Sequence, residues 1–522
     1  MSIKNKQAVN HIVIVGGGSA GWLTAGLLAC EHIGNSDSKV SVTLIESPDV
    51  KTIGVGEGTW PTMRSTLQKI GISETEFLQE CSASFKQGTK FVDWVSGDQS
   101  DYYYHPFTLP AGYTDINLVP HWQPQKSKVS FVNAVSVQGH LCDNNLAPKL
   151  NTTPEYAYVA NYAYHLDAGK FAELLQRHCT EKLGVKHVID HVTDINGAVD
   201  ENIRSVSTRL NGEIAGDLFI DCTGMASLLL GGHYQIPFVD LKPVLFNDTA
   251  LAIQVPYAAD DSAIASQTVS TAQSAGWIWD IGLSSRRGIG YTYSSSHSTD
   301  EQAELELRNY LARTCGTSAD SIESRKISFK PGHREKFWHK NCVAVGMAAG
   351  FLEPLEASAL VLVELAGQMI SEDLPANDEV MDIIARRFND KFLYRWDRII
   401  DFLKLHYVLS KRSDSDYWLD NRNEEGIPDS LNELLALWQY HVPSRNDFPQ
   451  SDEVFSAASY QYVLFGMGFE TESRMSFRHS ENADKAHQLF VENNRHANEL
   501  VKSLPGNRDL LAKIDQYGLQ KI

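Results

Sequence analysis

The chain has 522 residues, of which 43% are hydrophobic and 21% charged, and this composition is typical of a globular protein with several structural units. Its 46 Lys and Arg residues against 65 Asp and Glu residues give a net charge of −19, which disfavours binding to nucleic acid or to an anionic membrane surface. Small disulfide scaffolds, collagen-like chains and disordered chains are excluded, and a soluble enzyme is favoured.

The cysteines and the N-terminus indicate the compartment. The seven cysteines are widely spread and contain no C-x-x-C pair, which is typical of free thiols in a reducing environment and not of a metal site. The first ten residues lack a long apolar core, and no later run has the length of a membrane span. We therefore expect a cytoplasmic protein without a bound metal. The cysteines are Cys30, Cys81, Cys142, Cys179, Cys222, Cys315 and Cys342.

The first elements predict a dinucleotide-binding unit. A β-branched run at 11–15 predicts a strand, the apolar stretch at 22–30 predicts a helix, and residues 40–45 predict a second strand. Glu46 ends this second strand, where an acidic side chain can accept a hydrogen bond from a ribose hydroxyl. Strand, glycine turn, helix, strand and acid occur in the order that a dinucleotide fold needs.

The turn between the first strand and the helix carries a G-x-G-x-x-G pattern. Gly16, Gly18 and Gly21 permit a tight turn, the approach of a pyrophosphate and close packing of the helix on the sheet. Ser19 and Ala20 open the helix, whose first N–H groups can bind the anion. Such a pattern alone is weak, and its place between strand and helix makes it specific.

The middle of the chain returns to strand character. Residues 47–159 read as irregular, with an inserted substrate-side segment at about 60–155, and a helix is expected at 166–180. Strands are expected near 185–195 and 203–210. The apolar strand that ends in Asp221-Cys-Thr-Gly favours FAD over NAD, although an ordinary strand end is the alternative.

The later chain divides into strands and helices. Further strands are expected near 250–255, 276–281 and 290–294, and long helices at 358–374, 379–409 and 483–504. We therefore expect a FAD-binding module at 1–355 and a mainly helical substrate module at 356–522. In the strand at 276–281, Trp277 and Trp279 share one face, which is more often core packing than a functional wall.

Several motifs occur together and in order. The chain resembles the flavin-dependent tryptophan halogenase family, whose members are two-component enzymes that use FADH2. The resemblance extends from the first strand to the far C-terminus. It implies an α/β architecture with a Rossmann-like FAD-binding fold of the flavin monooxygenase type. The matching segments are Gly16–Trp22, Phe85–Trp94, Tyr164–Ala168, Trp277–Ile281, Phe351–Glu356, Asp401–Tyr407 and Asp416–Trp418.

The resemblance implies a reaction and two catalytic residues. Reduced FAD and oxygen convert a halide into hypohalous acid, which travels through the protein to an organic substrate. Lys86 matches the catalytic lysine, which donates a hydrogen bond to hypohalous acid or forms a haloamine. Glu356 matches the carboxylate that stabilises the cationic intermediate or removes its proton. Trp277 and Trp279 match the wall that keeps the substrate away from the flavin.

Further site residues are implied by the same matches. A halide is expected at Ser358 and Ala359, where the family's Ser-Thr-Gly reads Ala-Ser-Ala. The proline that ends the family's tryptophan motif is Gly282 here. Contacts with FAD are implied for the glycine turn, with Gly16, Gly18, Ser19, Ala20 and Gly21, and also for Glu46, Val192, Asp221, Gly346, Phe351 and Leu352.

The expected substrate is an electron-rich aromatic molecule of the indole, phenol or pyrrole type. His105 and Phe107 match positions that sandwich an indole. Residues 444–455 lack the family's Tyr- and Trp-rich segment that grips the amino acid backbone, so free tryptophan is disfavoured. Bromide is expected to be used better than chloride, because it is easier to oxidise and depends less on a well-formed pocket.

Two other functions are weighed against this one. An aromatic hydroxylase shares the glycine turn and the Asp-Cys-Thr-Gly strand, but Lys86, Glu356 and the two tryptophans argue against it. A non-catalytic flavin-binding module would need neither Lys86 nor Glu356. Only one dinucleotide fingerprint is present, so a separate NAD(P)H-dependent flavin reductase is the expected partner. The sequence leaves a homodimer open.

Overall fold

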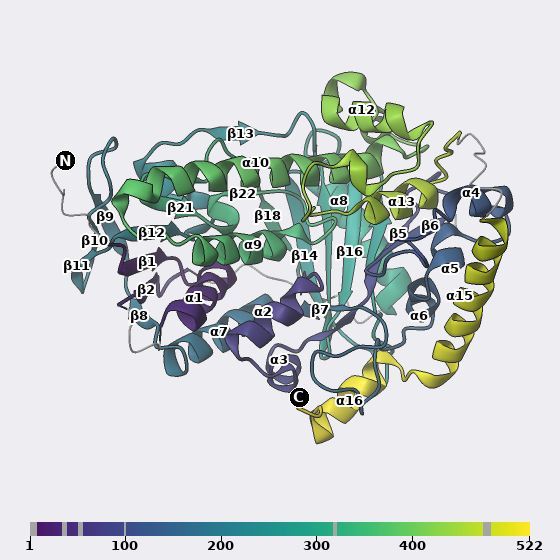
Figure 1. Cartoon of the computed structure of the whole chain (residues 1–522), viewed down its shortest axis with the longest axis horizontal. Helices are drawn as coiled ribbons and strands as arrows, with labels where there is room; N and C mark the ends of the chain where they lie inside the picture. The colour runs from purple at the N-terminus through teal and green to yellow at the C-terminus, as the bar shows by residue number, and fades with distance from the viewer. Residues whose placement is uncertain are drawn as a thin grey trace. The chain divides into compact units, whose positions relative to one another are not determined.

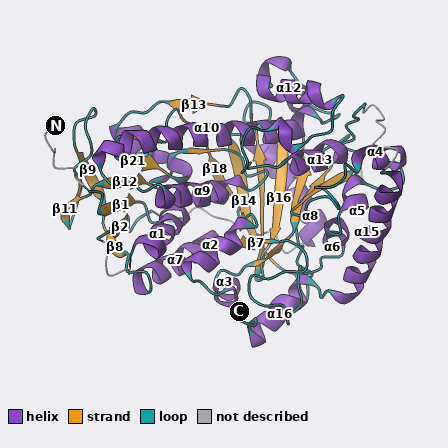
Figure 2. Cartoon of the chain, viewed as in Figure 1, coloured by secondary structure: helices purple, strands orange, loops and turns teal. Residues whose placement is uncertain are grey.

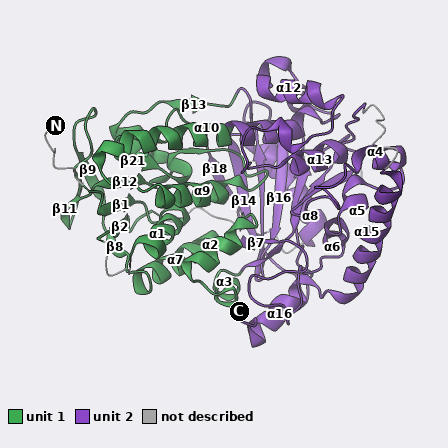
Figure 3. Ribbon diagram, in the orientation of Figure 1, with its two compact units in different colours: residues 1–82, 166–242, 329–396 green, residues 83–165, 243–328, 397–522 purple. Residues whose placement is uncertain are grey.

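The computed structural model describes residues 8–33, 39–50, 56–98, 101–316, 321–472 and 482–521 (Figure 1). Residues 1–7, which belong to the N-terminal segment whose lack of a long apolar core favoured a cytoplasmic location, lie outside these ranges. The chain forms two compact units (Figure 3). Unit 1 comprises Met1–Ser82, Leu166–Lys242 and Phe329–Trp396, and unit 2 comprises Ala83–His165, Pro243–Ser328 and Asp397–Ile522. The division at residue 355 expected from the sequence stays a prediction about folding modules.

Unit 1 is built on a six-stranded sheet with β1 near its centre. β1 pairs in parallel with β2 on one side and with β12 on the other. Ile12, Val13 and Ile14 of β1 are fully buried, as is typical of a parallel strand covered on both faces. The predicted Rossmann-like α/β fold is thus confirmed. The strand order is β20 (Trp338–His339), β21 (Cys342–Ala344), β12 (Leu218–Asp221), β1 (His11–Val15), β2 (Ser41–Glu46) and β8 (Lys186–Ile189).

Helices of unit 1 pack around α1 (Figure 2). α1 (Ser19–His32) follows the glycine turn and packs against α2 (Thr62–Ile70), α7 (Ala168–Glu181) and α9 (Ser358–Glu372). Two smaller sheets complete the unit. They are formed by β9 (Val192–Asn196), β10 (Ser205–Thr208) and β11 (Gly212–Ala215), and by β13 (Phe238–Asp240), β19 (Gly332–Arg334) and β22 (Gly350–Phe351).

Unit 2 is built on a seven-stranded sheet. One face packs on α8 (Asp300–Cys315), where Ile278, Ile289 and Leu307 form part of a buried core. Because side chains alternate along a strand, Trp277 and Trp279 lie on the other face of β16. The strand order is β18 (Arg325–Ser328), β14 (Thr249–Pro256), β17 (Arg286–Tyr293), β16 (Gly276–Gly282), β15 (Thr268–Ala272), β5 (Gly88–Val92) and β6 (Tyr102–Pro106).

Residues 47–159 are more regular than the sequence predicts. They contain α2 and α3 (Glu74–Glu80), the strands β4 (Ser84–Lys86), β5 and β6, and the short helices α4 (Val119–Trp122), α5 (Phe131–Val135) and α6 (Gln138–Asp143). Such short helices need tertiary packing, because nucleating a helix costs more than one turn returns. Phe131 of α5 supplies it here, since its ring packs edge-on against Phe465 of α13 (Ala457–Gly466).

The C-terminal part is mainly helical, as predicted. α10 (Asp378–Val408) is the long helix expected at 379–409, and α15 (Ala483–Ser503) is the one expected at 483–504. α15 runs beside α5 and α6 (Figure 1). Further helices among the described residues of this part are α11 (Asp416–Asp420), α12 (Asp429–Trp438) and α16 (Asn507–Tyr517).

All seven cysteines carry free thiols, as the sequence predicts. Burial raises the pKa of the Cys142 and Cys179 thiols, the latter to about 12, so these thiols stay protonated. Among the helices in the described ranges, none combines the length and the apolar character that a bilayer-spanning helix needs.

Candidate active site

The glycine turn of unit 1 is closely packed at Gly16 and Gly21 and open at Gly18. Gly16 has a φ of +115°, and a Cβ there would lie 2.2 Å from the carbonyl oxygen of Cys222. A Cβ at Gly21 would lie 1.9 Å from the carbonyl oxygen of Gly16. At Gly18, by contrast, an added Cβ would meet no described atom within 4 Å. This pattern fits a pyrophosphate group that approaches the backbone at Gly18.

The N-terminus of α1 offers donors to such an anion. Its N-cap is Gly18, which provides no side chain to cap the first N–H groups. The hydroxyl of Ser19 donates to the carbonyl oxygen of Ala168 at 3.3 Å and so points toward α7. The backbone of Ser19 and Ala20 is thus the part of these residues suited to hold phosphate, and the turn as a whole fits FAD.

Glu46 lies beside the same turn. Its carboxylate is in contact with Gly17, since a Cβ at Gly17 would lie 2.2 Å from Cδ of Glu46. Nε2 of His187, on β8, lies 2.9 Å from Oε2 of Glu46 and orients the carboxylate. The ribose role of Glu46 stays a prediction. His187 was not singled out from the sequence, because only the pairing of β2 with β8 brings the two residues together.

Asp221 ends β12 and organises the turn that follows. Its buried carboxylate accepts hydrogen bonds from the backbone N–H groups of Thr223, Leu229 and Leu230 at 3.1, 2.9 and 2.8 Å. These bonds hold the π-helical turn Leu228–His233 in place. The contact with FAD predicted for Asp221 is untested, and the side chain has a structural function of its own.

The other predicted cofactor residues of unit 1 lie on several elements. Gly346 opens a short 3₁₀ turn, and a Cβ there would lie 2.8 Å from Cβ of Ala20, so this turn packs on the start of α1. Val192 opens β9. Phe351 lies in β22, pairs with Gly332 of β19, and is followed by the buried Leu352. Only Gly346 is thus placed against the glycine turn by a described contact.

Glu356 lies in a tight turn that leads into α9. It is 4% exposed, and Glu353, directly before the turn, is 1% exposed. The backbone N–H of Ala357 donates to the carbonyl oxygen of Pro354 at 3.1 Å, and Ala357 has a left-handed φ of 55°. α9 then begins with Ser358, which is buried, and Ala359, which is exposed. Both carboxylates precede the helix and do not form a helical face.

A buried carboxyl group follows on α9. Glu364 is 2% exposed, and its oxygens accept hydrogen bonds from the hydroxyls of Thr66 at 2.5 Å and Thr62 at 3.1 Å. Burial raises the pKa of Glu364 to about 8, and the two hydroxyls only partly oppose this rise. The carboxyl is therefore neutral at pH 7. Sequence reasoning did not single out Glu364, because a lone Glu in an apolar helical run carries no distinctive signal.

The raised pKa of Glu364 predicts a pH effect on stability. The folded protein keeps this proton up to about pH 8, while the unfolded chain loses it near the ordinary glutamate pKa of 4.5. Between these two pH values, the free energy of unfolding of the wild type should therefore fall by about 1.4 kcal/mol per pH unit relative to that of Glu364→Gln. Above about pH 8, the difference between the two proteins should stay constant. Denaturant midpoints from pH 5 to pH 9 measure the difference. Glu372→Gln, at an exposed position of α9, should track wild type, and a constant Glu364→Gln difference would refute the assignment.

Unit 2 holds Lys86 at the end of β4. The side chain is 1% exposed, and its Nζ lies 5.4 Å from the ring centroid of Phe107. The strand is anchored by Ser84, whose hydroxyl donates to the carbonyl oxygen of Gly282 at 2.5 Å. His105 is buried in β6, where a Cβ at Gly88 would lie 2.5 Å from its carbonyl oxygen. The structure thus brings Lys86 to Phe107.

His165 of β7 (Ala163–Leu166) shares this environment. It pairs with Ser84 in the antiparallel ladder, so its side chain lies on the same face as those of Ser84 and Lys86. Its Nε2 lies 2.8 Å from the hydroxyl of Thr268. Burial, followed by the charge of Lys86, holds the pKa of His165 well below its usual range. A neutral imidazole therefore faces the lysine, although the sequence showed this residue only as part of a motif.

An aromatic cluster adjoins His105. The ring centroid of His105 lies 5.3 Å from that of Phe402 and 6.2 Å from that of Phe455. Phe402 and Phe455 stack at 3.8 Å, and Tyr460 of α13 meets Phe402 edge-on at 4.9 Å. Phe455 ends the stretch that lacks the family's aromatic segment, so sequence reasoning missed its contact with His105. The neighbourhood of His105 is apolar and aromatic.

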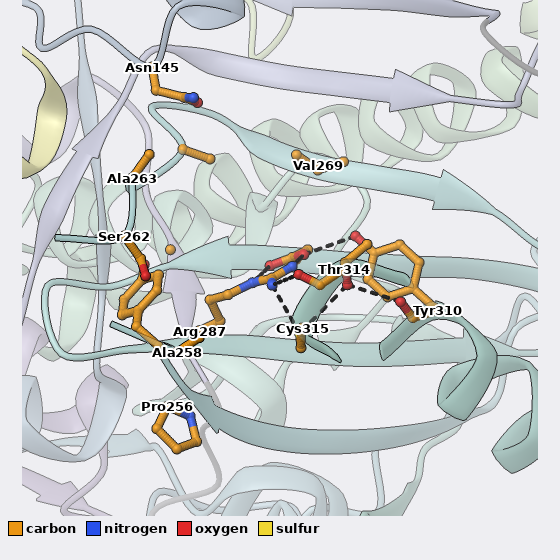
Figure 4. Close-up of a pocket in the computed structure, with 14 residues that line it drawn as sticks. Asn145, Pro256, Ala258, Ser262, Ala263, Val269, Arg287, Tyr310, Thr314 and Cys315 are labelled. Carbon is orange, nitrogen blue, oxygen red and sulfur yellow. Dashed lines mark hydrogen bonds and ion pairs between the residues drawn. The ribbon is translucent and has the colours of Figure 1, made fainter. Parts of the chain in front are cut away.

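Trp277 and Trp279 lie side by side on β16. Their ring centroids are 6.2 Å apart, and Trp279 covers Gly290 of β17, where a Cβ would lie 2.1 Å from the indole. The opposite face of the sheet borders a cavity of about 470 Å³ (Figure 4). Its polar part is the ion pair of Asp280 with Arg287, and the hydroxyl of Tyr310 donates to Asp280 at 2.9 Å. None of the predicted site residues is among those that line this cavity.

Comparison with known proteins identifies the family. The family model described as tryptophan halogenase matches residues 11–482. The chain belongs to the tryptophan halogenase family. Tryptophan 6-halogenase SttH from Streptomyces toxytricini is 32% identical over 98% of this chain and 99% of its own length. The crystal structure of a tryptophan halogenase from Shewanella frigidimarina is 52% identical, with a TM-score of 0.95 and 99% coverage of each chain.

A further solved structure is described as a flavin-dependent halogenase, without a named substrate. BrvH, a flavin-dependent halogenase from Brevundimonas sp. BAL3, is 31% identical, with a TM-score of 0.85 over 97% of this chain and 99% of that one. Membership of the tryptophan halogenase family makes this protein a flavin-dependent halogenase that uses FADH2 and a halide. The alternatives of a hydroxylase and of a non-catalytic flavin-binding module are therefore set aside.

Proposed function

We propose that the protein makes hypohalous acid from a halide and uses it to halogenate an electron-rich aromatic molecule of the indole, phenol or pyrrole type. The observation that carries this proposal is the buried Lys86, whose ammonium faces the ring of Phe107. Bound FADH2 would supply the two electrons that activate oxygen, and oxygen is the oxidant of the halide. A lysine in this place serves as a hydrogen-bond donor to hypohalous acid or as an amine that carries the halogen.

The groups around Lys86 support this role. The ring face of Phe107 attracts the ammonium of Lys86. When the Lys86 nitrogen carries the halogen instead, the same ring gives it an apolar surface. His165 stays neutral, so it adds no second positive charge next to the lysine. Ser84 ties the strand to Gly282, which limits the movement of Lys86. The contact with Phe107 thus acts on the side chain itself, and the bond of Ser84 acts on the strand that carries it.

In unit 1, the proposal assigns the halide to Ser358 with the backbone N–H of Ala359, and the acid–base role to Glu356. The start of α9 suits an anion, because its first N–H groups lack intrahelical partners. Glu356 is buried, where a carboxylate interacts strongly with the positive charge that develops on an arene under attack. It stabilises that charge or removes the ring proton.

The substrate proposal rests on His105 and Phe107. His105 lies in β6, which ends at Pro106, and Phe107 follows this strand directly, so the two proposed ring contacts come from neighbouring positions. His105 is backed by Phe402 and Phe455, so a neutral ring meets an apolar wall. The ammonium and carboxylate of free tryptophan would cost several kcal/mol if buried without partners. Relatives named as tryptophan halogenases make free tryptophan the second candidate.

Competition assays test the substrate and halide together. We expect indole to be halogenated faster than tryptophan at equal concentration, and bromide to be incorporated in preference to chloride at equal concentration. Isotope patterns in mass spectrometry identify both products. The halide preference follows from the lower oxidation cost of bromide and from the methyl group of Ala359 beside the expected anion site. Efficient, regioselective chlorination of free tryptophan would overturn the substrate proposal.

The reaction needs a partner and a compartment. A separate NAD(P)H-dependent flavin reductase supplies FADH2, as in other two-component members of the family. We place the reaction in the cytoplasm, which the seven free thiols favour. Homodimer formation remains an open proposal that size-exclusion chromatography with light scattering can test.

A further inference from the structure

The turn that carries Glu356 is tied to a distant segment of unit 1. Nε1 of Trp60, just before α2, donates a hydrogen bond of 2.8 Å to the backbone carbonyl oxygen of Glu356. Two turns further along α9, Glu364 receives the hydroxyls of Thr62 and Thr66, which belong to α2 itself. We call these four residues the turn clamp: Trp60, Thr62, Thr66 and Glu364.

The turn needs such support because its backbone is strained. Ala357 adopts a left-handed φ of 55°, a region that residues with a Cβ disfavour. This residue stands between Glu356 and Ser358, so a return of Ala357 to a negative φ would reorient both neighbours. Strained backbone persists where the surroundings hold it. The indole of Trp60 supplies one such hold, on the peptide unit that joins Glu356 to Ala357.

The second hold ties α9 to α2. Both oxygens of Glu364 are engaged by α2, and the group is almost completely buried. An apolar side chain would satisfy packing at this place without burying a polar group. The two directional bonds instead determine how far α9 can slide or rotate on α2. Since Ser358 opens α9, its position depends on them.

We propose that the turn clamp consists of positioning residues that hold Glu356 and Ser358 in their reactive arrangement. This inference rests on the roles proposed above for these two residues. The clamp acts on the backbone of Glu356 and on the body of α9, and none of its members needs to touch a halide or an arene.

Trp60→Phe tests the clamp, because phenylalanine keeps an aromatic ring and removes the N–H donor. We expect the dissociation constant of bromide to rise about fivefold, the equivalent of one lost hydrogen bond. It is measured by titrating bromide into the FAD-bound protein and following the flavin absorbance. The ratio of halogenated arene to FADH2 oxidised should fall by a similar factor, with FAD still bound.

Trp338→Phe is the matched control. Trp338 is also in unit 1, and its Nε1 donates to the carbonyl oxygen of Lys340 at 3.0 Å. This variant loses the same kind of hydrogen bond in a strand that does not carry the turn. It should keep wild-type bromide affinity and a wild-type product ratio. Equal losses in Trp60→Phe and Trp338→Phe would show a general effect on stability and would overturn the proposal.

Glu364 provides the second test. Glu364→Gln replaces one carboxyl oxygen with an amide nitrogen, so it keeps two hydrogen-bonding atoms in a neutral group of the same shape and should retain wild-type bromide affinity. Glu364→Leu fills the space without these bonds and should weaken bromide binding about fivefold. If leucine and glutamine behave alike while both variants bind FAD, Glu364 is not a positioning residue and the proposal fails.

Ser358→Ala separates failure of the clamp from failure of the proposed function. If this variant leaves bromide affinity unchanged, the halide role of Ser358 is wrong. The clamp is then judged on the product ratio alone, which must still fall in Trp60→Phe and not in Trp338→Phe. If Ser358→Ala weakens bromide binding and Trp60→Phe changes neither readout, the clamp is wrong and the halide role stands.

Discussion

Lys86→Ala is expected to abolish halogenation while FAD binding and FADH2 oxidation continue at the wild-type rate. The proposed role of Lys86 follows the formation of hypohalous acid, so its loss should uncouple the two halves of the reaction. Halogenated arene is measured by mass spectrometry, and oxygen consumption reports flavin oxidation. The effect should be the largest of any single substitution, because the structure places Lys86 alone among the described lysines over the ring of Phe107.

Lys90, on the next strand β5, serves as the control for Lys86. Nζ of Lys90 lies 3.3 Å from Asp143, and the side chain is partly exposed. Lys90→Ala should therefore keep full halogenation. Lys86→Arg retains a positive charge but replaces the compact ammonium with a planar guanidinium, and it should be inactive as well. Halogenation by Lys86→Ala at the wild-type rate would remove this residue from the mechanism.

Glu356→Gln is expected to lower the halogenation rate by on the order of 10²-fold, the usual contribution of a positioned acid or base. The amide cannot accept the ring proton and does not stabilise a positive charge as a carboxylate does. FADH2 oxidation should again be unchanged, because the proposed role of Glu356 lies at the arene. Single-turnover measurements with preformed FADH2 isolate this step from the supply of reduced flavin.

Glu353 provides the decisive comparison for Glu356. Both residues are buried, Glu353 directly before the turn at 1% exposure and Glu356 within it at 4%. Glu353→Gln should therefore reveal which carboxylate serves the reaction. We expect Glu353→Gln to lower the halogenation rate much less than Glu356→Gln does. A large loss of rate in Glu353→Gln with little change in Glu356→Gln would transfer the acid–base role to Glu353. As a control, Glu372→Gln, at an exposed position of α9, should leave the halogenation rate intact.

The large elements follow from local patterns in the sequence. β1 covers the same residues that the β-branched run predicts, and β16 and α10 begin and end within two residues of the expected bounds. These segments carry strong periodic signals, and the glycine turn requires backbone conformations that few other residues adopt. Three of the family's motifs, Gly16–Trp22, Trp277–Ile281 and Asp401–Tyr407, lie in these segments, whereas Phe85–Trp94 lies in the part of the chain that was expected to be irregular.

Tertiary structure decided the short elements and the partners of the predicted residues. α5 spans only five residues and forms against α13, which lies far along the chain. His187 meets Glu46, His165 faces Lys86, and Phe455 meets His105 only because separate strands and helices pack together. A residue's burial and its long-range hydrogen bonds are set by packing, which no local pattern encodes. The sequence alone determined the family, the strands beside the glycine turn and the candidate residues, whereas packing determined the pKa of Glu364 and the clamp on the Glu356 turn.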